Sequence, residues 1–384
     1  MNNRIINSKV LFLLALIVAF ACTNQHDSKK FEILDEANLM RYASGVRIAK
    51  VDQGYLLQLK LPWSQSVQEQ DLFLLWPDSL SVPSKYNQLK LIKTPVNKLI
   101  TLSSTQWSPL LKLGMTDRIK GISEAGYVLD STMRRLLAQG KVAEVAKNGQ
   151  IDFEKLVSTE AELVLYSPDP MGIPETLKRT GINLLPWPDY MENSPLGRAE
   201  WFRVLGYLTG EQAATDRWFD QVAAEYNQLK NLVDKQSLPK PTIMAEKAFN
   251  GQWYIPGGRS YLAKIFKDAG ADYIWKDEPS NGSIPLDIET IIAKGGEATF
   301  WRISHASKSD YSYAQLLREN ELYGSFTAFQ NRKVILCNTL KNGYFERSQY
   351  EPNVVLADFI HILHPDLLTD HQVVYHELLM PDNE

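Results

Sequence analysis

The segment LGRAEWFRVLGYLTGEQAATDRWFDQVAAEYNQLKNLVDKQ, residues 196–236, decides the fold of this chain. Its apolar residues recur at spacings of three and four, which is the period of an α-helix with one buried face. They are Trp201, Val204, Leu205 and Leu208, followed by Ala213, Trp218, Val222 and Tyr226. The segment contains no proline, and Gly206 and Gly210 interrupt the pattern. We predict a helix to about Leu208, a tight turn, and a longer helix to about Asp234.

On both sides of this segment, short apolar stretches alternate with amphipathic stretches of helix length. The strands expected before it are residues 98–102, 118–123, 163–166 and 182–187, and those after it are residues 242–245, 298–301 and 334–337. This alternation is typical of a parallel sheet covered by helices. The fold class is therefore α/β, with two lobes that have central, mostly parallel sheets and are bridged by a long helix.

An N-terminal extension with a different pattern precedes the first lobe. Alternating stretches at residues 55–61 and 72–76 are bounded by glycine and proline, which indicates β-strands. The domain boundaries expected are residues 1–21 for a signal peptide, 22–94 for an anchor, linker and β-rich extension, 95–190 for the N-terminal lobe, 191–239 for bridging helices, and 240–384 for the C-terminal lobe and tail.

The amino terminus predicts export. Arg4 and Lys9 precede an apolar run that ends before Cys22, and this run is too short to cross a bilayer as a helix. The stretch resembles a bacterial lipobox, with Ala19 where leucine is commonest. We expect lipidation of Cys22 and a membrane-anchored lipoprotein in the periplasm or cell envelope. Plain secretion is the alternative.

Cysteine content and charge exclude several classes of protein. Cys22 and Cys337 are the only cysteines, so a lipidated Cys22 leaves no intramolecular disulfide. Cys337 lies in an apolar stretch, which favours a buried strand thiol over a catalytic one. The formal net charge is −4, and it becomes −6 without residues 1–21 because they carry two positive charges. No basic signature of nucleic-acid binding is present.

Catalytic and metal-binding motifs are also missing from the sequence. The histidines show no metal-ligand spacing; they are His26, His305, His361, His364, His371 and His376. No nucleophile elbow, phosphate loop or paired carboxylate motif is found, and Ser103 with Ser104 suits the cap of a following helix better than a nucleophile. We therefore expect neither an enzyme nor a resident metal.

Four motifs resemble the helical-backbone class of periplasmic substrate-binding proteins. They are Ile100-Thr101-Leu102-Ser103-Ser104 with Arg118-Ile119-Lys120-Gly121-Ile122-Ser123; Ile151-Asp152-Phe153-Glu154-Lys155-Leu156 with Leu163-Val164; Leu205-Gly206-Tyr207-Leu208-Thr209-Gly210-Glu211; and Phe326-Thr327-Ala328-Phe329 with His364-Pro365. Their order matches across residues 95–370. The sequence departs from the family in the second motif, where Ala161-Glu162 stands in place of Pro-Asp, and in the extension.

The resemblance implies a function in uptake. Members of this class deliver cobalamin, ferric siderophores or haem to ABC importers, so the implied partners are permease and ATPase subunits. The implied ligand is a metal chelate bound as cargo by a monomer, with no cofactor. A corrinoid and a ferric siderophore are equal candidates, and haem is third. A surface-anchored interaction protein without a transport role, docking through the extension, is the alternative.

Ligand-binding residues are expected just after the strands, because ligands of open α/β sheets lie beyond the strands' carboxyl ends. The candidates are Ser104, Trp107, Tyr127, Tyr166, Phe249, Trp253, Tyr254, Trp301, Arg302 and Tyr344. Aromatic rings suit the face of a large chelate, and Arg302 suits an anionic rim. Core packing is the alternative for each aromatic. Trp253 and Tyr254 are neighbours on a strand, so at least one should be exposed.

The permease-docking residues come from the resemblance, which implies one acidic residue on each lobe. Glu175 matches in the first lobe, directly after Pro174. In the second lobe, the helix expected at residues 260–269 offers Asp268 beside Lys267. Ordinary solvated surface acids are the alternative.

Overall fold

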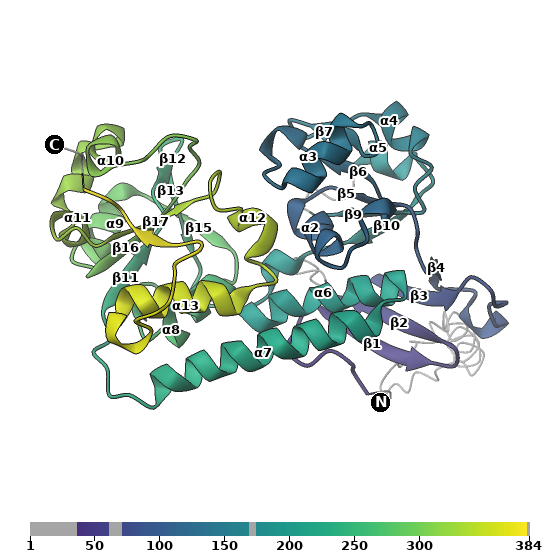
Figure 1. The fold of residues 1–384 in the computed structure, drawn as a ribbon, viewed down its shortest axis with the longest axis horizontal. Helices are drawn as coiled ribbons and strands as arrows, with labels where there is room; N and C mark the ends of the chain where they lie inside the picture. Colours follow the sequence, from purple (N-terminus) through teal and green to yellow (C-terminus); the bar gives the residue numbers. More distant parts are fainter. Residues whose placement is uncertain (1–36, 61–70, 169–173, 382–384) are drawn as a thin grey trace, which may run out of the picture. The chain divides into compact units, whose positions relative to one another are not determined.

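The computed structural model describes residues 37–60, 71–168 and 174–381 (Figure 1). The predicted signal peptide and the lipidation site Cys22 lie outside these residues. Within them, no helix is both long and apolar enough to cross a membrane.

The N-terminal extension is rich in β-strands, as its alternating stretches predict, and it forms a four-stranded sheet. The strands are β1 (Val46–Val51), β2 (Gly54–Leu59), β3 (Asp71–Pro77) and β4 (Lys90–Thr94). They follow one another in the sheet; the first two pairs are antiparallel and β3 pairs with β4 in parallel. Ile48, Leu57 and Phe73 are aligned across three strands and are all buried. One face of this sheet is therefore apolar and covered.

The N-terminal lobe contains a six-stranded sheet in the order β10-β9-β5-β6-β7-β8. All neighbours are parallel except β7 and β8. The strands are β5 (Leu99–Thr101), β6 (Ile119–Ser123), β7 (Ala143–Lys147), β8 (Gln150–Ile151), β9 (Leu163–Tyr166) and β10 (Asn183–Pro186), and the helices are α2 (Ser104–Lys112), α3 (Ser131–Ala138), α4 (Phe153–Ser158) and α5 (Glu175–Lys178). The parallel strands confirm the predicted α/β pattern.

The bridge is a pair of helices, α6 (Pro195–Thr209) and α7 (Gln212–Asp234), which run side by side in Figure 1. Ser194 caps α6 by accepting the backbone N–H of Gly197, and Gly210 ends it in the left-handed conformation, at φ 82°. A side chain at Gly206 would overlap Thr215 of α7, so this glycine permits the close approach of the two helices. The predicted helix, turn and longer helix are confirmed.

The C-terminal lobe contains a five-stranded sheet in the order β14-β11-β16-β17-β18, which is parallel except for its last pair. A second, antiparallel sheet has the order β12-β13-β15. The strands are β11 (Thr242–Ala245), β12 (Ala248–Phe249), β13 (Gln252–Pro256), β14 (Asp272–Tyr273), β15 (Ser283–Leu286), β16 (Phe300–His305), β17 (Val334–Asn338) and β18 (Glu377–Leu378). The helices are α8 (Tyr261–Asp268), α9 (Ile288–Gly295), α10 (Tyr313–Glu319), α11 (Thr327–Gln330), α12 (Tyr344–Arg347) and α13 (Pro352–Leu363).

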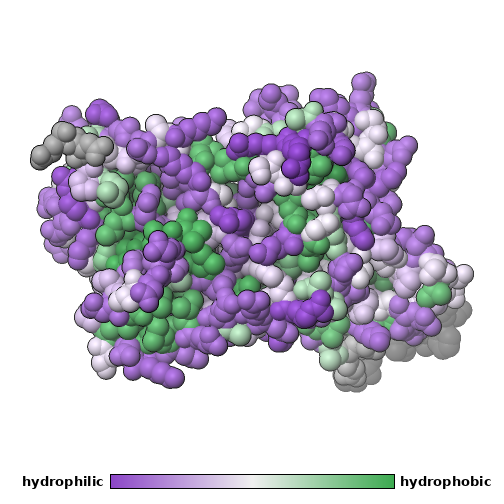
Figure 2. Space-filling model, viewed as in Figure 1, coloured by the Kyte–Doolittle hydropathy of each residue, from purple (hydrophilic) through white to green (hydrophobic). Residues whose placement is uncertain are grey.

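The extension shares its core with the N-terminal lobe. One cluster of buried side chains joins Ile48 and Phe73 of the extension with Trp107 of α2 and Leu205 of α6. A separate cluster fills the C-terminal lobe. Outside these cores, hydrophilic residues cover much of the face seen in Figure 2, with hydrophobic patches between them. Because burial of apolar surface is the main stabilising contribution to folding, the extension is part of the folded body rather than an appended module.

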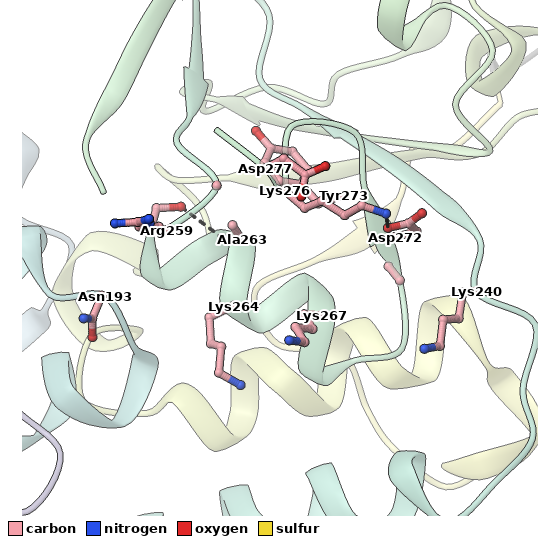
Figure 3. Close-up of a pocket in the computed structure, with 13 residues that line it drawn as sticks. Asn193, Lys240, Arg259, Ala263, Lys264, Lys267, Asp272, Tyr273, Lys276 and Asp277 are labelled. Atoms are coloured by element: carbon pink, nitrogen blue, oxygen red, sulfur yellow. Dashed lines mark hydrogen bonds and ion pairs between the residues drawn. The ribbon is translucent and has the colours of Figure 1, made fainter. Parts of the chain in front are cut away.

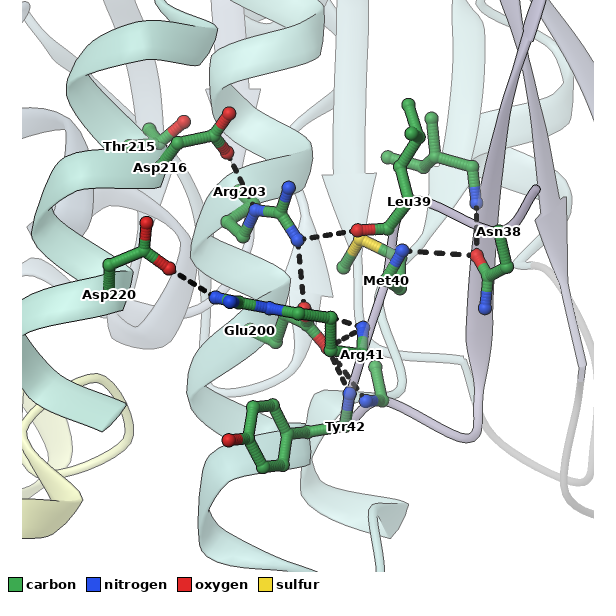
Figure 4. Close-up of polar contacts among 12 residues, drawn as sticks. Asn38, Leu39, Met40, Arg41, Tyr42, Glu200, Arg203, Thr215, Asp216 and Asp220 are labelled. Atoms are coloured by element: carbon green, nitrogen blue, oxygen red, sulfur yellow. Dashed lines mark hydrogen bonds and ion pairs between the residues drawn. The ribbon is translucent and has the colours of Figure 1, made fainter. Parts of the chain in front are cut away.

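Two buried carboxylates, Glu192 just before α6 and Glu200 within it, hold the chain just before β1, and Figure 4 shows the contacts of Glu200. Glu200 of α6 accepts the backbone N–H groups of Arg41, Tyr42 and Ala43 at 2.7 to 3.0 Å. Glu192 accepts the N–H of Ser44 and of Gly45, each at 2.8 Å. Both carboxylates therefore replace the water that these backbone groups would otherwise bind.

Candidate functional site

The two lobes meet where α2 and α12 begin, just beyond strands β5 and β17. Ser104, at the start of α2, donates its hydroxyl hydrogen bond to the backbone oxygen of Phe345 in α12, at 2.9 Å. Further along the two segments, the hydroxyl oxygens of Ser108 and Tyr350 lie 2.9 Å apart. The carboxyl ends of both parallel sheets thus face one region, which is where an open α/β sheet binds its ligand.

The start of α2 explains why Ser104 is free to reach across. Ser103 is the N-cap, and its side chain accepts the backbone N–H of Thr105 at 3.3 Å. The expected capping role therefore belongs to Ser103. Ser104 occupies the first helical position, where its hydroxyl is available to the other lobe.

Glu346 makes a second link between the lobes. Its carboxylate, on α12, accepts the backbone N–H of Leu129 at 2.6 Å and that of Asp130 at 3.4 Å. Asp130 itself caps α3 through the N–H of Met133. Burial raises the pKa of Glu346, although both backbone hydrogen bonds favour the ionised form.

A polar cavity of about 490 Å³ lies beside this contact and has walls from both lobes. Its charged residues are Lys112 and Asp130 on one side, and Lys341, Glu346, Arg347 and Glu351 on the other. Cations and acids are balanced in number, so the cavity offers hydrogen bonds of both kinds rather than one sign of charge.

Four aromatic side chains near strand ends are exposed. Three of them were predicted: Tyr127, with 69% of its surface exposed, Phe249, with 68%, and Tyr254, with 45%. The fourth, Phe345, is 56% exposed, and its own backbone oxygen accepts the hydrogen bond from Ser104. Sequence reasoning missed Phe345, although it directly follows the predicted Tyr344 at the start of α12.

Six other predicted site residues are buried and belong to the cores. They are Trp107, Tyr166, Trp253, Trp301, Arg302 and Tyr344. Trp253 and Trp301 stack on each other, with ring centroids 5.9 Å apart, and their indole N–H groups donate to the backbone oxygens of Ala245 and Glu246. The expectation that these two tryptophans line a cleft is therefore wrong, because their strand faces are covered by other side chains of the same lobe.

Arg302 is also not available to bind an anionic ligand. Its guanidinium pairs with Glu246, donates to the hydroxyl of Ser304 at 2.6 Å and to Nε2 of His376 at 3.3 Å. These partners satisfy the buried charge within the C-terminal lobe. Tyr344 packs over the same guanidinium, with its ring centroid 5.6 Å from it, and is buried as well.

The two predicted docking acids differ in accessibility. Glu175 is exposed and pairs with Lys178 at 2.7 Å. Asp268 is buried; it accepts a hydrogen bond from the Tyr226 hydroxyl at 2.8 Å and pairs with Lys264. Asp268 therefore cannot present a carboxylate to a partner, and that expectation is corrected. The exposed residue of this helix is Lys267.

His305 is a further polar residue at a strand end that sequence reasoning did not select. It ends β16 and stacks on Tyr311, with ring centroids 3.7 Å apart. Burial lowers the pKa of its imidazole, and the neighbouring Lys247 lowers it further, so the ring is neutral at pH 7. Within the part of the chain that the structure describes, no three histidine, cysteine, aspartate or glutamate residues gather as a metal site.

Cys337 is a free, buried thiol of β17, as its apolar neighbours predict. Burial raises its pKa to about 11, so the reactive thiolate is scarce at pH 7.

Comparisons with known proteins agree with this architecture. A family model described as periplasmic binding protein matches residues 99–339. An uncharacterized lipoprotein of Methanocaldococcus jannaschii is 27% identical over 293 residues, which cover 73% of this chain and 68% of that protein. A cobalamin-binding protein of Halobacterium salinarum is 23% identical over 263 residues, covering 67% of each.

The fold has counterparts among solved structures. A periplasmic binding protein from Veillonella parvula superposes with a TM-score of 0.58 and 15% sequence identity, covering 82% of this chain and 99% of that one. The family match spans both lobes and the two helices that connect them. The chain therefore belongs to the periplasmic binding protein family, and its helical connection places it in the helical-backbone class.

Proposed function

We propose that this chain is the lipid-anchored substrate-binding component of an ABC importer and captures a metal chelate, a corrinoid or a ferric siderophore, between its lobes. The observation that carries the proposal is the placement of exposed Phe345 where α12 of one lobe meets Ser104 of the other. Exposed Tyr127, after β6, offers a second ring from the N-terminal lobe.

Members of the periplasmic binding protein family are not enzymes, and they bind their ligands as cargo rather than as cofactors. A site for such cargo needs a rigid surface and groups that fix orientation. Aromatic rings supply wide, flat contact area, and the polar cavity beside them supplies both donors and acceptors. A corrinoid presents a flat macrocycle with amide side chains, and a ferric siderophore presents an anionic rim, so both fit this combination.

Between these two ligands, the relative named as a cobalamin-binding protein favours the corrinoid. Haem is the third candidate, since an exposed tyrosine can supply a phenolate ligand to ferric iron. Of the four tyrosines among the predicted site residues, Tyr127 and Tyr254 are exposed, whereas Tyr166 and Tyr344 are buried. A haem-binding function would therefore depend on Tyr127 and Tyr254 as iron ligands.

The test is a titration of the purified full chain with cyanocobalamin, a ferric hydroxamate and haemin, followed by calorimetry and absorbance. Phe345→Ala and Tyr127→Ala should each weaken binding of the true ligand by about tenfold, since each ring contributes roughly 1 to 1.5 kcal/mol of contact. Leu322→Ala in the 3-10 helix Glu321–Ser325 is the matched control, because Leu322 is comparably exposed and lies away from strand ends.

The outcomes separate the ligands. Binding of cyanocobalamin alone supports the corrinoid assignment, and a shifted Soret band that disappears in Tyr127→Phe supports haem. If none of the three ligands binds, the chelate assignment fails. If binding occurs but neither aromatic variant weakens it more than Leu322→Ala does, the site has been placed wrongly.

The cellular setting belongs to the same proposal. A relative named as a lipoprotein supports an anchor at Cys22, which lies outside the described residues. Replacing this residue (Cys22→Ser) should move the chain from the membrane fraction to the soluble fraction. Permease and ATPase subunits are the proposed partners, and exposed Glu175 is the proposed docking residue on the N-terminal lobe.

The alternative is a non-transport interaction protein that docks through the extension. Glu200 and the shared core tie the extension to α6. Removal of residues 31–94 would expose surface that is buried in the N-terminal lobe. Substitutions at exposed positions of the extension are therefore a more specific test of its role.

A further inference from the structure

A second cavity, of about 500 Å³, lies on the C-terminal lobe alongside α8 (Figure 3). Its walls come from four segments: the loop before α6, the start of β11, α8 with the residues before it, and the loop around β14. The charged residues that line it are Lys240, Arg259, Lys264, Lys267, Asp272, Lys276 and Asp277.

The cavity is strongly basic in a chain that is acidic overall. Five cations face two carboxylates, whereas the whole chain has a formal net charge of −4. Two of the cations have partners: Lys276 pairs with Asp272 at 2.6 Å, and Lys264 pairs with Asp268. The positive charge here is therefore a local feature and not a consequence of composition.

Three cations remain without compensation. Within the ranges the structure describes, the side chains of Lys240, Arg259 and Lys267 have no hydrogen-bond or ion-pair partner, and all three are exposed. Asp277 is the one carboxylate of the cavity that forms no ion pair among these residues. The cavity therefore has more hydrogen-bond donors than acceptors, and these three cationic side chains find no acceptor within it.

The same cavity has two neutral sources of anion affinity. Asn193, from the loop before α6, places a side-chain amide on its wall. Gly258, Arg259 and Ser260 also line it, so the positive end of the α8 dipole borders the cavity. These features favour an anionic ligand, as the three uncompensated cations also do.

We propose that this cavity binds the phosphate group of an anionic molecule through Lys240, Arg259 and Lys267. Arginine and lysine together suit a phosphate, because the guanidinium donates in pairs and the ammonium groups act as point charges. The volume accommodates a phosphate with an attached glycerol-sized group. The source is either the headgroup of an anionic phospholipid at the membrane surface or a soluble phosphate ester.

This site is separate from the cleft between the lobes. None of its lining residues lines the cavity beside α2 and α12. Failure of the phosphate assignment would therefore leave chelate binding untouched, and failure of chelate binding would leave this assignment standing.

The variant for the test is Lys240→Gln, Arg259→Gln and Lys267→Gln together in the full chain. Its matched control is Arg135→Gln, Lys141→Gln and Lys147→Gln, which removes the same charges from exposed positions of the N-terminal lobe. Thermal unfolding of both variants checks that the fold is kept.

The lipid arm measures cosedimentation with vesicles of pure phosphatidylcholine and of phosphatidylcholine with phosphatidylglycerol. Residues 1–36 are the same in all three proteins, so any part of the difference that Arg4 and Lys9 cause is common to them, and a loss confined to the cavity variant reports the cavity. We expect the cavity variant to lose roughly tenfold or more of that difference, and the control variant to keep it. The difference should also shrink as salt is raised.

The soluble arm titrates glycerol 3-phosphate into the same three proteins by calorimetry. Saturable binding that the cavity variant loses assigns a soluble phosphate ester, and anionic vesicle binding without it assigns the lipid headgroup. Absence of both signals overturns the proposal, as does an equal loss in the control variant. An acidic protein segment would then be the occupant to consider.

Discussion

The carboxylate of Glu200, buried in α6, accepts the backbone N–H of Tyr42 at 2.7 Å across a sequence separation of 158 residues. Arg203, one turn further along α6, pairs with the same carboxylate at 2.8 Å and donates to the backbone oxygen of Leu39 at 2.7 Å. The helix that links the two lobes therefore also holds residues 39–43, which lead into the extension sheet.

Replacing Glu200 with glutamine should destabilise the fold. An amide has one acceptor oxygen, whereas the carboxylate serves three backbone N–H groups and Arg203, so Glu200→Gln leaves buried donors unpaired. We expect a loss of about 3 kcal/mol in the free energy of unfolding, measured by urea denaturation. Glu154→Gln, at an exposed position of α4, is the control and should change it by less than about 0.5 kcal/mol. Equal effects of the two substitutions would contradict the anchoring role of Glu200.

Trp253 and Tyr254 make a matched pair on one strand. Trp253 is 1% exposed and packs against Trp301, Tyr323 and Phe326, whereas the side chain of Tyr254 is on the opposite face. Trp253→Ala should lower the free energy of unfolding by about 3 to 5 kcal/mol, and Tyr254→Ala by less than about 1 kcal/mol. Chemical denaturation of the two variants measures this contrast. A small effect of Trp253→Ala together with lost chelate binding would return Trp253 to the ligand site.

Glu175 and Asp268, the two acidic residues predicted to dock the permease, should respond differently to substitution. Asp268→Asn removes the negative partner of Lys264 and weakens the bond with Tyr226, so we expect a loss of about 1 to 3 kcal/mol of stability. Glu175→Lys should leave stability within about 0.5 kcal/mol and reduce uptake in reconstituted vesicles. Salt titration of uptake checks the second result, because exposed charge pairs weaken as ionic strength rises. Unchanged uptake in Glu175→Lys would remove this residue from the docking surface.

Acidification should destabilise the C-terminal lobe through buried histidines. Burial lowers the pKa of His376 well below its ordinary value of 6.5, and burial also lowers that of His364. The unfolded chain therefore binds more protons than the folded one below about pH 6.5, so this part of the stability is present above that pH and is lost as pH falls. We expect the free energy of unfolding to decline from about pH 6.5 towards pH 5.

His376→Gln isolates the main contributor, because the amide oxygen can still accept from Arg302 while the titration is removed. Urea denaturation at several pH values should show a shallower decline for this variant than for the natural chain. Parallel curves over that range would show that His376 does not govern the acid sensitivity.

Much of the secondary structure follows from local patterns. The helix pair at residues 195–234 was predictable because an amphipathic repeat, interrupted at Gly206 and Gly210, lies within one continuous segment. Most parallel strands of both lobes were predicted from short apolar stretches, but β7 and β14 were missed, and β16 begins at Phe300 and runs to His305 rather than covering residues 298–301. In the extension, the alternating stretches predicted β2 and β3 but not β1 or β4.

The candidate site was less predictable, because position after a strand does not decide exposure. Tyr127, Phe249 and Tyr254 are exposed as expected, but Trp301 and Arg302 lie inside β16, which continues to His305, and are buried. Phe345 was missed because its exposure depends on how α12 packs against α2.

The sequence by itself determined the α/β class, the helical connection between two lobes and the resemblance to a family, because these depend on short-range periodicity and on the order of motifs. Only the tertiary structure decided which face of each strand is covered. Alternation predicts that Trp253 and Tyr254 point to opposite sides, but Tyr323 and Phe326, about 70 residues further along the chain, bury the tryptophan. Asp268 is likewise buried, because Tyr226 of the bridging helix α7 lies against it and donates a hydrogen bond to its carboxylate. Burial depends on contacts between distant segments, and local periodicity carries no information about them.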